Sequence, residues 1–261
     1  MSHPKYDHQL IVGFLSGQGD AIIKRSAATL TDRARAQHLD SPIVEIVGSK
    51  ASVAASVKTS LGECLRKLTA QSRLYLMGHG DHELYKLGGW KGEDVADLLK
   101  ECGLPNVAII SITGCKSSLG PLTMNQQTGK LVDDAFQNFA ARFHFALGTG
   151  EKPLKSVVYA RVFNVQVISH EQHFLKAAGQ FARLYDTKEK QDLVVGRKIT
   201  RNFNDVTLKN KEAPQPALNG LPMYSSKQTH SKRRYYWQGE EQRWEWVAYD
   251  QENVADYLSS P

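Results

Sequence analysis

Hydrophobic residues alternate along the chain between short apolar runs and longer amphipathic stretches. Short runs rich in β-branched and aromatic residues that end at glycine or polar residues predict buried strands. Such runs lie within residues 9–15, 43–47, 73–80, 107–115 and 157–163. Apolar positions repeating every three or four residues predict helices over residues 20–38, 51–70, 92–102, 131–142 and 170–185. Loops are expected at residues 116–128 and 209–228.

Two of the predicted strands and the helix between them form a strand–helix–strand unit. The strands within residues 73–80 and 107–115 flank the helix over 92–102, which Gly103 and Pro105 end. Strands joined in this way run parallel, so their carboxyl ends lie at the same edge of the sheet. Six or so strands flanked by helices predict an α/β fold, a three-layer αβα sandwich with a mainly parallel sheet.

The last predicted element is a β-hairpin over residues 233–249, with Gly239 at its turn. Side chains alternate between the two faces of a strand. Tyr235 and Trp237 are therefore expected on one face and Arg234 on the other.

The most informative polar residues are a histidine and a cysteine at the ends of the two parallel strands. His79 lies between Gly78 and Gly80, and Cys115 follows Gly114. A thiol and an imidazole brought to one sheet edge are a candidate nucleophile and base. The N–H groups of Gly80 and Cys115 are candidate donors to a substrate carbonyl oxygen. The ordinary alternative is a small core cysteine and an unrelated histidine, which is the more common use of these residue types.

These motifs resemble the self-cleaving cysteine protease domain of large RTX toxins, which belongs to the caspase-like group of cysteine peptidases. The resemblance rests on Arg73 to Asp81, Leu87-Gly88-Gly89-Trp90, Ile110 to Ser117, Asp7 to Val12 and Gly19-Asp20. It implies a caspase-like sheet with a C-terminal β-hairpin flap. Residues 1–170 are then the catalytic core, and residues 171–261 are an elaboration of the same domain.

The resemblance implies a thiol endopeptidase with a His79–Cys115 dyad that hydrolyses a host polypeptide, itself or both. Free-standing proteases of this kind are bacterial effectors or toxins. We therefore expect a virulence protein that is secreted without a cleaved signal peptide and acts in the host cell cytosol. A third catalytic residue is not assigned, because Asp81 is close to His79 in sequence but need not point inward. Three cysteines cannot all pair, which favours a reducing compartment.

The positive net charge of the chain predicts an anionic partner. The chain has 33 Lys and Arg against 27 Asp and Glu, a formal net charge of +6 at pH 7. The toxin family is activated by inositol hexakisphosphate, which binds a basic pocket beside the hairpin flap. The resemblance implies this compound as an allosteric activator, bound by residues among Lys24, Arg35, Arg73, Arg161, Lys232, Arg233 and Arg234. Arg73 matches a family pocket arginine directly.

Two other functions are compatible with the sequence. Basic and aromatic residues interleave between Arg233 and Trp246, as in modules that bind single-stranded nucleic acid. A non-catalytic scaffold effector on a protease-like fold is the second alternative. No metal site is expected, because His170 and His173 are three residues apart where the zinc-protease helix motif needs four. No apolar run approaches membrane-spanning length.

Overall fold

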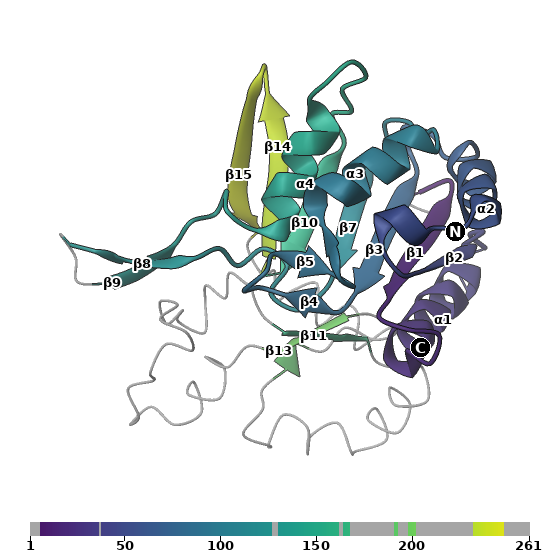
Figure 1. Cartoon of the computed structure of the whole chain (residues 1–261), viewed down its shortest axis with the longest axis horizontal. Coiled ribbons are helices and arrows are strands. Elements are labelled where there is room, and N and C mark those ends of the chain that lie inside the picture. The colour runs from purple at the N-terminus through teal and green to yellow at the C-terminus, as the bar shows by residue number, and fades with distance from the viewer. Residues whose placement is uncertain are drawn as a thin grey trace.

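A seven-stranded sheet forms the centre of the molecule in the computed structural model (Figure 1). The structure describes residues 6–36, 38–126, 130–161, 164–167, 191–192, 198–201 and 232–247. The strand order is β15-β14-β10-β7-β3-β1-β2. These strands are β1 (Gln9–Leu15), β2 (Ile43–Val47), β3 (Arg73–Gly78), β7 (Ile109–Thr113), β10 (Val157–Arg161), β14 (Lys232–Gln238) and β15 (Glu241–Val247). The strands β1, β2, β3, β7 and β10 run parallel, and the β14–β15 hairpin pairs antiparallel with β10.

Helices cover both faces of this sheet, which confirms the predicted three-layer sandwich. Helix α1 (Ala21–Ala36) packs on one face, and α2 (Ala55–Leu65), α3 (Gly92–Glu101) and α4 (Phe139–Gly148) pack on the other. Strand β1 is buried along its whole length. Its Leu10, Val12 and Phe14 join a large core under α2, α3 and α4. Its Ile11 and Leu15 join a smaller core under α1. Each such side chain stabilises the fold by roughly 1.5–3 kcal/mol.

Shorter strands form smaller sheets beside the main one. β4 (Gly80–Asp81), β5 (Lys86–Leu87) and β6 (Trp90–Lys91) form one of these directly after β3. β8 (Leu122–Asn125) and β9 (Lys130–Asp133) form a ribbon that extends away from the body of the molecule (Figure 1). Another sheet contains β11 (Asn164–Val167), β13 (Lys198–Arg201) and β12 (Gln191–Asp192). Within the described residues, no helix combines the length and apolarity needed to cross a membrane.

The region after Cys115 differs from the prediction. The expected helix over 131–142 is wrong in its first part, because Lys130–Asp133 pairs with β8 and α4 begins only after Asn138. Asn138 caps α4, since its Oδ1 accepts a hydrogen bond from the Ala141 amide at 2.9 Å. Strand β8 also lies within the segment 116–128 that was expected to be a loop.

The remaining predicted elements agree with the structure more closely. The helix expected over 51–70 is shorter, and a 3₁₀ turn at Lys50–Ser52 precedes it. The hairpin over 233–249 is confirmed as β14 and β15. The predicted helix 170–185 and loop 209–228 lie outside the described residues, as does the expected boundary at residue 170.

Candidate active site

The structure places the backbone segments that carry His79 and Cys115 side by side at the carboxyl edge of the sheet. β3 and β7 are neighbours, and their parallel pairing aligns Met77 with Thr113. His79 and Cys115 each follow two residues later, so the chain leaves both strands at the same level. β2 and β3 lie on opposite sides of β1. This change of direction makes the edge a topological switch point, where open α/β sheets bind their ligands.

Two glycines bring the His79 and Cys115 segments into direct backbone contact. A Cβ at Gly80 would overlap the backbone carbonyl of Cys115, so the approach is possible only without a side chain. A Cβ at Gly114 would collide with the Leu87 side chain and lie 3.6 Å from the Cα of Gly80. The contact between the two segments therefore depends on glycine at position 80, whereas a side chain at position 114 would first displace Leu87.

A buried carboxylate that the sequence left unassigned completes the site. Asp20 precedes α1, and its Oδ1 lies 3.1 Å from Nε2 of His79. The Asp20 side chain is 3% exposed, whereas the His79 side chain is 48% exposed. Asp81, the nearby alternative, is exposed, and its Oδ1 accepts the amides of Glu83 and Leu84 at 3.1 and 3.0 Å. Asp81 therefore stabilises the turn after His79, and Asp20 is the carboxylate that orients the imidazole.

Further hydrogen bonds fix the Asp20 carboxylate and keep it ionised. Its Oδ1 also accepts the Ile23 amide at 3.3 Å, and its Oδ2 accepts the amide and hydroxyl of Ser16 at 3.3 and 3.1 Å. Burial by itself raises the pKa of Asp20, but the amides of Ile23 and Ser16, then His79 and the Ser16 hydroxyl, lower it below its ordinary value. The signal available in the sequence was an aspartate between the first strand and the first helix.

Cys115 differs from the other two cysteines in its surroundings. All three are reduced thiols. Cys64 and Cys102 pack against the large core, and burial raises the pKa of both. Cys115 lies outside that core, in a tight turn where the following residue, Lys116, has a left-handed backbone with φ of 51°. Cys115 is therefore the thiol at the sheet edge, on the segment that contacts the one carrying His79.

Four of the predicted basic residues share the sheet face that carries α1. Arg73 alternates onto the same side as Tyr75, which belongs to the small core under α1. The register of β7, β10 and β14 places Arg161, Lys232 and Arg234 on the same side of the sheet. The Arg73 guanidinium lies 4.4 Å from the Tyr75 ring centroid, and Lys232 Nζ lies 4.1 Å from that of Tyr159. This set, called the basic face below, consists of Arg73, Arg161, Lys232 and Arg234.

The other three predicted basic residues lie elsewhere. Arg233 is on the opposite face of β14, where it is 1% exposed and forms an ion pair with Asp133. Lys24 pairs with Glu45 of the edge strand β2 at 3.1 Å. Arg35 forms an ion pair within α1 at 3.2 Å. The structure therefore does not bring all seven residues to one pocket, because strand alternation and α1 separate these three from the basic face.

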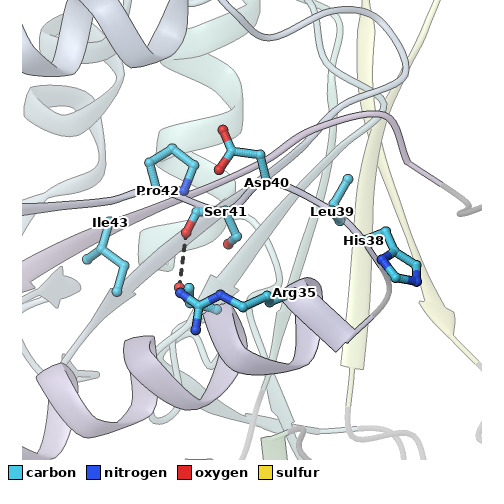
Figure 2. Close-up of a pocket in the computed structure, with 8 residues that line it drawn as sticks. Arg35, His38, Leu39, Asp40, Ser41, Pro42 and Ile43 are labelled. Atoms are coloured by element: carbon cyan, nitrogen blue, oxygen red, sulfur yellow. Dashed lines mark hydrogen bonds between the residues drawn. The ribbon is translucent and has the colours of Figure 1, made fainter.

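A cavity of about 660 Å³ lies at the amino edge of the sheet (Figure 2). It forms between the end of α1 and the segment that enters β2. Its lining includes Arg35, His38, Leu39, Asp40, Pro42 and Ile43. The Thr31 hydroxyl donates a hydrogen bond to the Ser41 carbonyl at 3.1 Å and ties the two segments together. This cavity is separate from the candidate active site.

Comparison with known proteins identifies no family for this chain. No protein-family model and no curated protein matches the sequence. A solved structure described as an SPT with PLP aligns with 13% identity and a TM-score of 0.25. The alignment covers 60% of this chain and 29% of that chain, so this chain spans less than a third of that protein's length. A similarity this low supports no inference about the site.

Proposed function

We propose that the chain is a cysteine endopeptidase whose catalytic residues are Cys115, His79 and Asp20. The observation that carries the proposal is the buried Asp20 carboxylate 3.1 Å from His79 Nε2, at the sheet edge where Cys115 also lies. A carboxylate that orients an imidazole beside a thiol is the arrangement that activates a cysteine nucleophile. The resemblance of the His79 and Cys115 motifs to the RTX-toxin protease domain supports the same activity.

Asp20 determines which nitrogen of His79 accepts a proton. An ionised carboxylate only accepts hydrogen bonds, so Nε2 carries the proton in its contact with Asp20. Nδ1 then has the lone pair that takes the proton of the Cys115 thiol. The thiolate adds to the scissile carbonyl, and the imidazolium gives its proton to the leaving amine as the C–N bond breaks. A water molecule deprotonated by His79 then hydrolyses the thioester and releases the Cys115 thiol.

The N–H groups of Gly80 and Cys115 are the proposed donors to the oxyanion that forms on the substrate. They belong to the two backbone segments that touch at this edge. Fixed donors of this kind stabilise the transition state more than the bound substrate. A side chain at position 80 displaces both segments, so we expect Gly80→Ala to lose activity although it adds a single carbon.

We also propose that inositol hexakisphosphate binds the basic face and activates the enzyme. Its phosphates accept charge-assisted hydrogen bonds from guanidinium and ammonium groups. Arg73, Arg161, Lys232 and Arg234 carry such groups on one side of the sheet. The ligand is abundant in eukaryotic cytosol, which fits a bacterial effector that is inactive until it reaches a host cell and cleaves a host polypeptide there.

The nucleic-acid alternative gains no support from the hairpin. Trp244 packs against the large core, and the centroids of the Trp244 and Trp246 rings lie 4.7 and 4.4 Å from the Arg233 guanidinium. Bases stack on accessible aromatic rings, whereas these two rings cover a buried charge. The non-catalytic scaffold is the alternative that labelling of the thiol distinguishes from the protease.

Labelling with a thiol-reactive peptide probe tests the proposed function. The purified chain is incubated with the probe, with and without inositol hexakisphosphate, and mass spectrometry locates the labelled cysteine. We expect labelling of Cys115 that is faster with the polyanion and abolished in His79→Ala. Cys64 and Cys102 are internal controls, because burial raises their pKa and leaves little reactive thiolate. Labelling at Cys64 or Cys102 in place of Cys115 would reject the assignment.

A further inference from the structure

The C-terminal hairpin holds the segment after the proposed nucleophile mainly through one residue, Ser118. We call residues 115–120 the nucleophile loop. Ser118 is fully buried, and its amide donates to the carbonyl of Arg161 at 2.9 Å. Its carbonyl accepts from Nη1 of Arg233 at 2.5 Å, and its hydroxyl lies 2.9 Å from the hydroxyl of Tyr235. Every polar group of Ser118 is therefore bonded, and two of its three partners are side chains of β14.

Arg233 is itself fixed by a buried ion pair. Its two Nη atoms donate to the Asp133 carboxylate at 2.6 and 2.5 Å, and the rings of Trp244 and Trp246 cover the guanidinium. Asp133 also accepts the amide of Gly120 at 3.2 Å. The side chains of Arg233 and Asp133 are 1% and 8% exposed. The ion pair therefore contacts the nucleophile loop at two points from inside the protein and away from the basic face.

Tyr235 joins the same loop to the start of α4. Its hydroxyl donates to the Ala135 carbonyl at 3.1 Å and accepts from Nδ2 of Asn138 at 3.0 Å. The hydroxyl of Ser118 lies within hydrogen-bond distance of the same tyrosine oxygen. Asn138 is the cap of α4, so the tyrosine links the loop to a helix end that is itself fixed.

We infer that Arg233 and Tyr235 are positioning residues that set the place of Cys115 by holding Ser118. The inference rests on the proposed function, because the position of Cys115 matters for activity only if Cys115 is the nucleophile. Arg233 and Tyr235 point toward the nucleophile loop. Lys232 and Arg234, which alternate with them on β14, belong to the basic face. One strand thus contacts the nucleophile loop with one side and the proposed activator surface with the other.

A double-mutant cycle on the hydrogen bond between Tyr235 and Ser118 tests this inference. Tyr235→Phe removes a hydroxyl and keeps the buried ring, and Ser118→Ala removes the partner hydroxyl. The readout is the rate at which iodoacetamide alkylates Cys115, located by mass spectrometry. Ser118→Ala is expected to be about tenfold slower than wild type, since one hydrogen bond of this kind corresponds to about that factor, and Tyr235→Phe, which also loses the bonds to Ala135 and Asn138, is expected to be at least as slow. The double variant is expected to be no slower than the slower single variant, because both remove the same interaction.

Arg233→Lys tests the other contact. Lysine keeps a positive charge opposite Asp133 but lacks the fork that reaches Asp133 and the Ser118 carbonyl together. We expect Cys115 to be alkylated about tenfold more slowly in this variant as well. Tyr236→Phe, on the other side of β14, is the matched control and is expected to react at the wild-type rate.

A positioning role is separated from general loosening of the fold by Cys64, which lies against the core in the same samples. Its alkylation rate is expected to stay unchanged in the Tyr235, Ser118 and Arg233 variants. Wild-type Cys115 rates in Tyr235→Phe and Ser118→Ala, additive losses in the double variant, or parallel acceleration of Cys64 would overturn the inference. Failure of the proposed function would be visible separately. In that case His79→Ala, made in an otherwise wild-type chain, would leave the rate of Cys115 alkylation unchanged.

Discussion

Replacing Asp20 with asparagine isolates the effect of the carboxylate charge on His79. The change keeps the size of the side chain and its capacity to cap α1, because asparagine is as good an N-cap as aspartate. It removes the negative charge and converts one oxygen into an N–H donor. In the structure Oδ1 serves both the Ile23 amide and His79, while Oδ2 serves the amide and hydroxyl of Ser16. A single amide oxygen cannot replace both.

Either orientation of the new amide weakens the productive state of His79. If the NH₂ group faces the ring, Nε2 becomes the acceptor and the proton moves to Nδ1, which must accept from Cys115. If the oxygen faces the ring, the hydrogen bond to the imidazolium is no longer charge-assisted on both sides. Such bonds contribute about 1.5–3 kcal/mol, so we expect roughly a 10- to 150-fold loss of rate. The free energy of unfolding is expected to fall by about 1–3 kcal/mol, because in either orientation the amide leaves the N–H group of Ile23 or of Ser16 without its acceptor.

The assay is the rate of Cys115 labelling by the peptide probe with inositol hexakisphosphate present, paired with urea unfolding of the same variant. Asp81→Asn is the matched control, since it changes an exposed carboxylate near His79, and its rate is expected within about twofold of wild type. A wild-type labelling rate in Asp20→Asn would refute the reasoning. The reasoning would also be refuted if the labelling rate of Asp20→Asn fell only because the variant is partly unfolded under the assay conditions.

Further predictions concern stability and the activator. Burial lowers the pKa of His144 to about 4, so below pH 6.5 the unfolded chain binds a proton that the folded chain does not. Urea unfolding should therefore show a loss of about 2–3 kcal/mol between pH 7 and pH 4.5, and the loss should be smaller in His144→Gln. Asp133→Ala leaves Arg233 buried without its counter-ion and is expected to lower the free energy of unfolding by about 3–5 kcal/mol, whereas the exposed Arg243→Ala should change it by less than about 1 kcal/mol. Inositol hexakisphosphate at about 300 times its Kd should stabilise the fold by about 3.4 kcal/mol, and calorimetric titration should show weaker binding to Arg73→Ala. Equal affinity for wild type and Arg73→Ala would remove the basic face from the proposal.

Local patterns predicted the sheet well where each strand is a short apolar run with clear ends. β1 and β2 have the predicted bounds, because each is a short run of β-branched and apolar residues with clear ends, although β1 is buried throughout and β2 is buried only at Val44 and Ile46. The segment Lys130–Asp133 could not be predicted in this way. Its apolar pair suits a helix or a strand equally, and pairing with β8 decides between them. The position of the Asn138 cap then sets where α4 begins.

The candidate active site could be predicted only in the part that follows from strand connection. His79 and Cys115 meet because two parallel strands with one helix between them must end at one edge. Asp20 contacts His79 across 59 residues of sequence, and Arg233 contacts Asp133 across 100. No local spacing encodes either contact. Alternation along β14 does separate Arg233 from Arg234, but the acidic partner that accounts for a buried arginine is visible only in three dimensions.

The pH dependence of Cys115 alkylation in wild type and in His79→Ala tests most directly whether the two residues form a catalytic pair. In wild type we expect an inflection on the acid side of the rate profile, because transfer of the thiol proton to His79 forms the reactive thiolate. That inflection should be absent from His79→Ala. Cys64 and Cys102 in the same samples should react only at higher pH, since burial raises their pKa. Identical Cys115 profiles in the two proteins would contradict the catalytic role of His79.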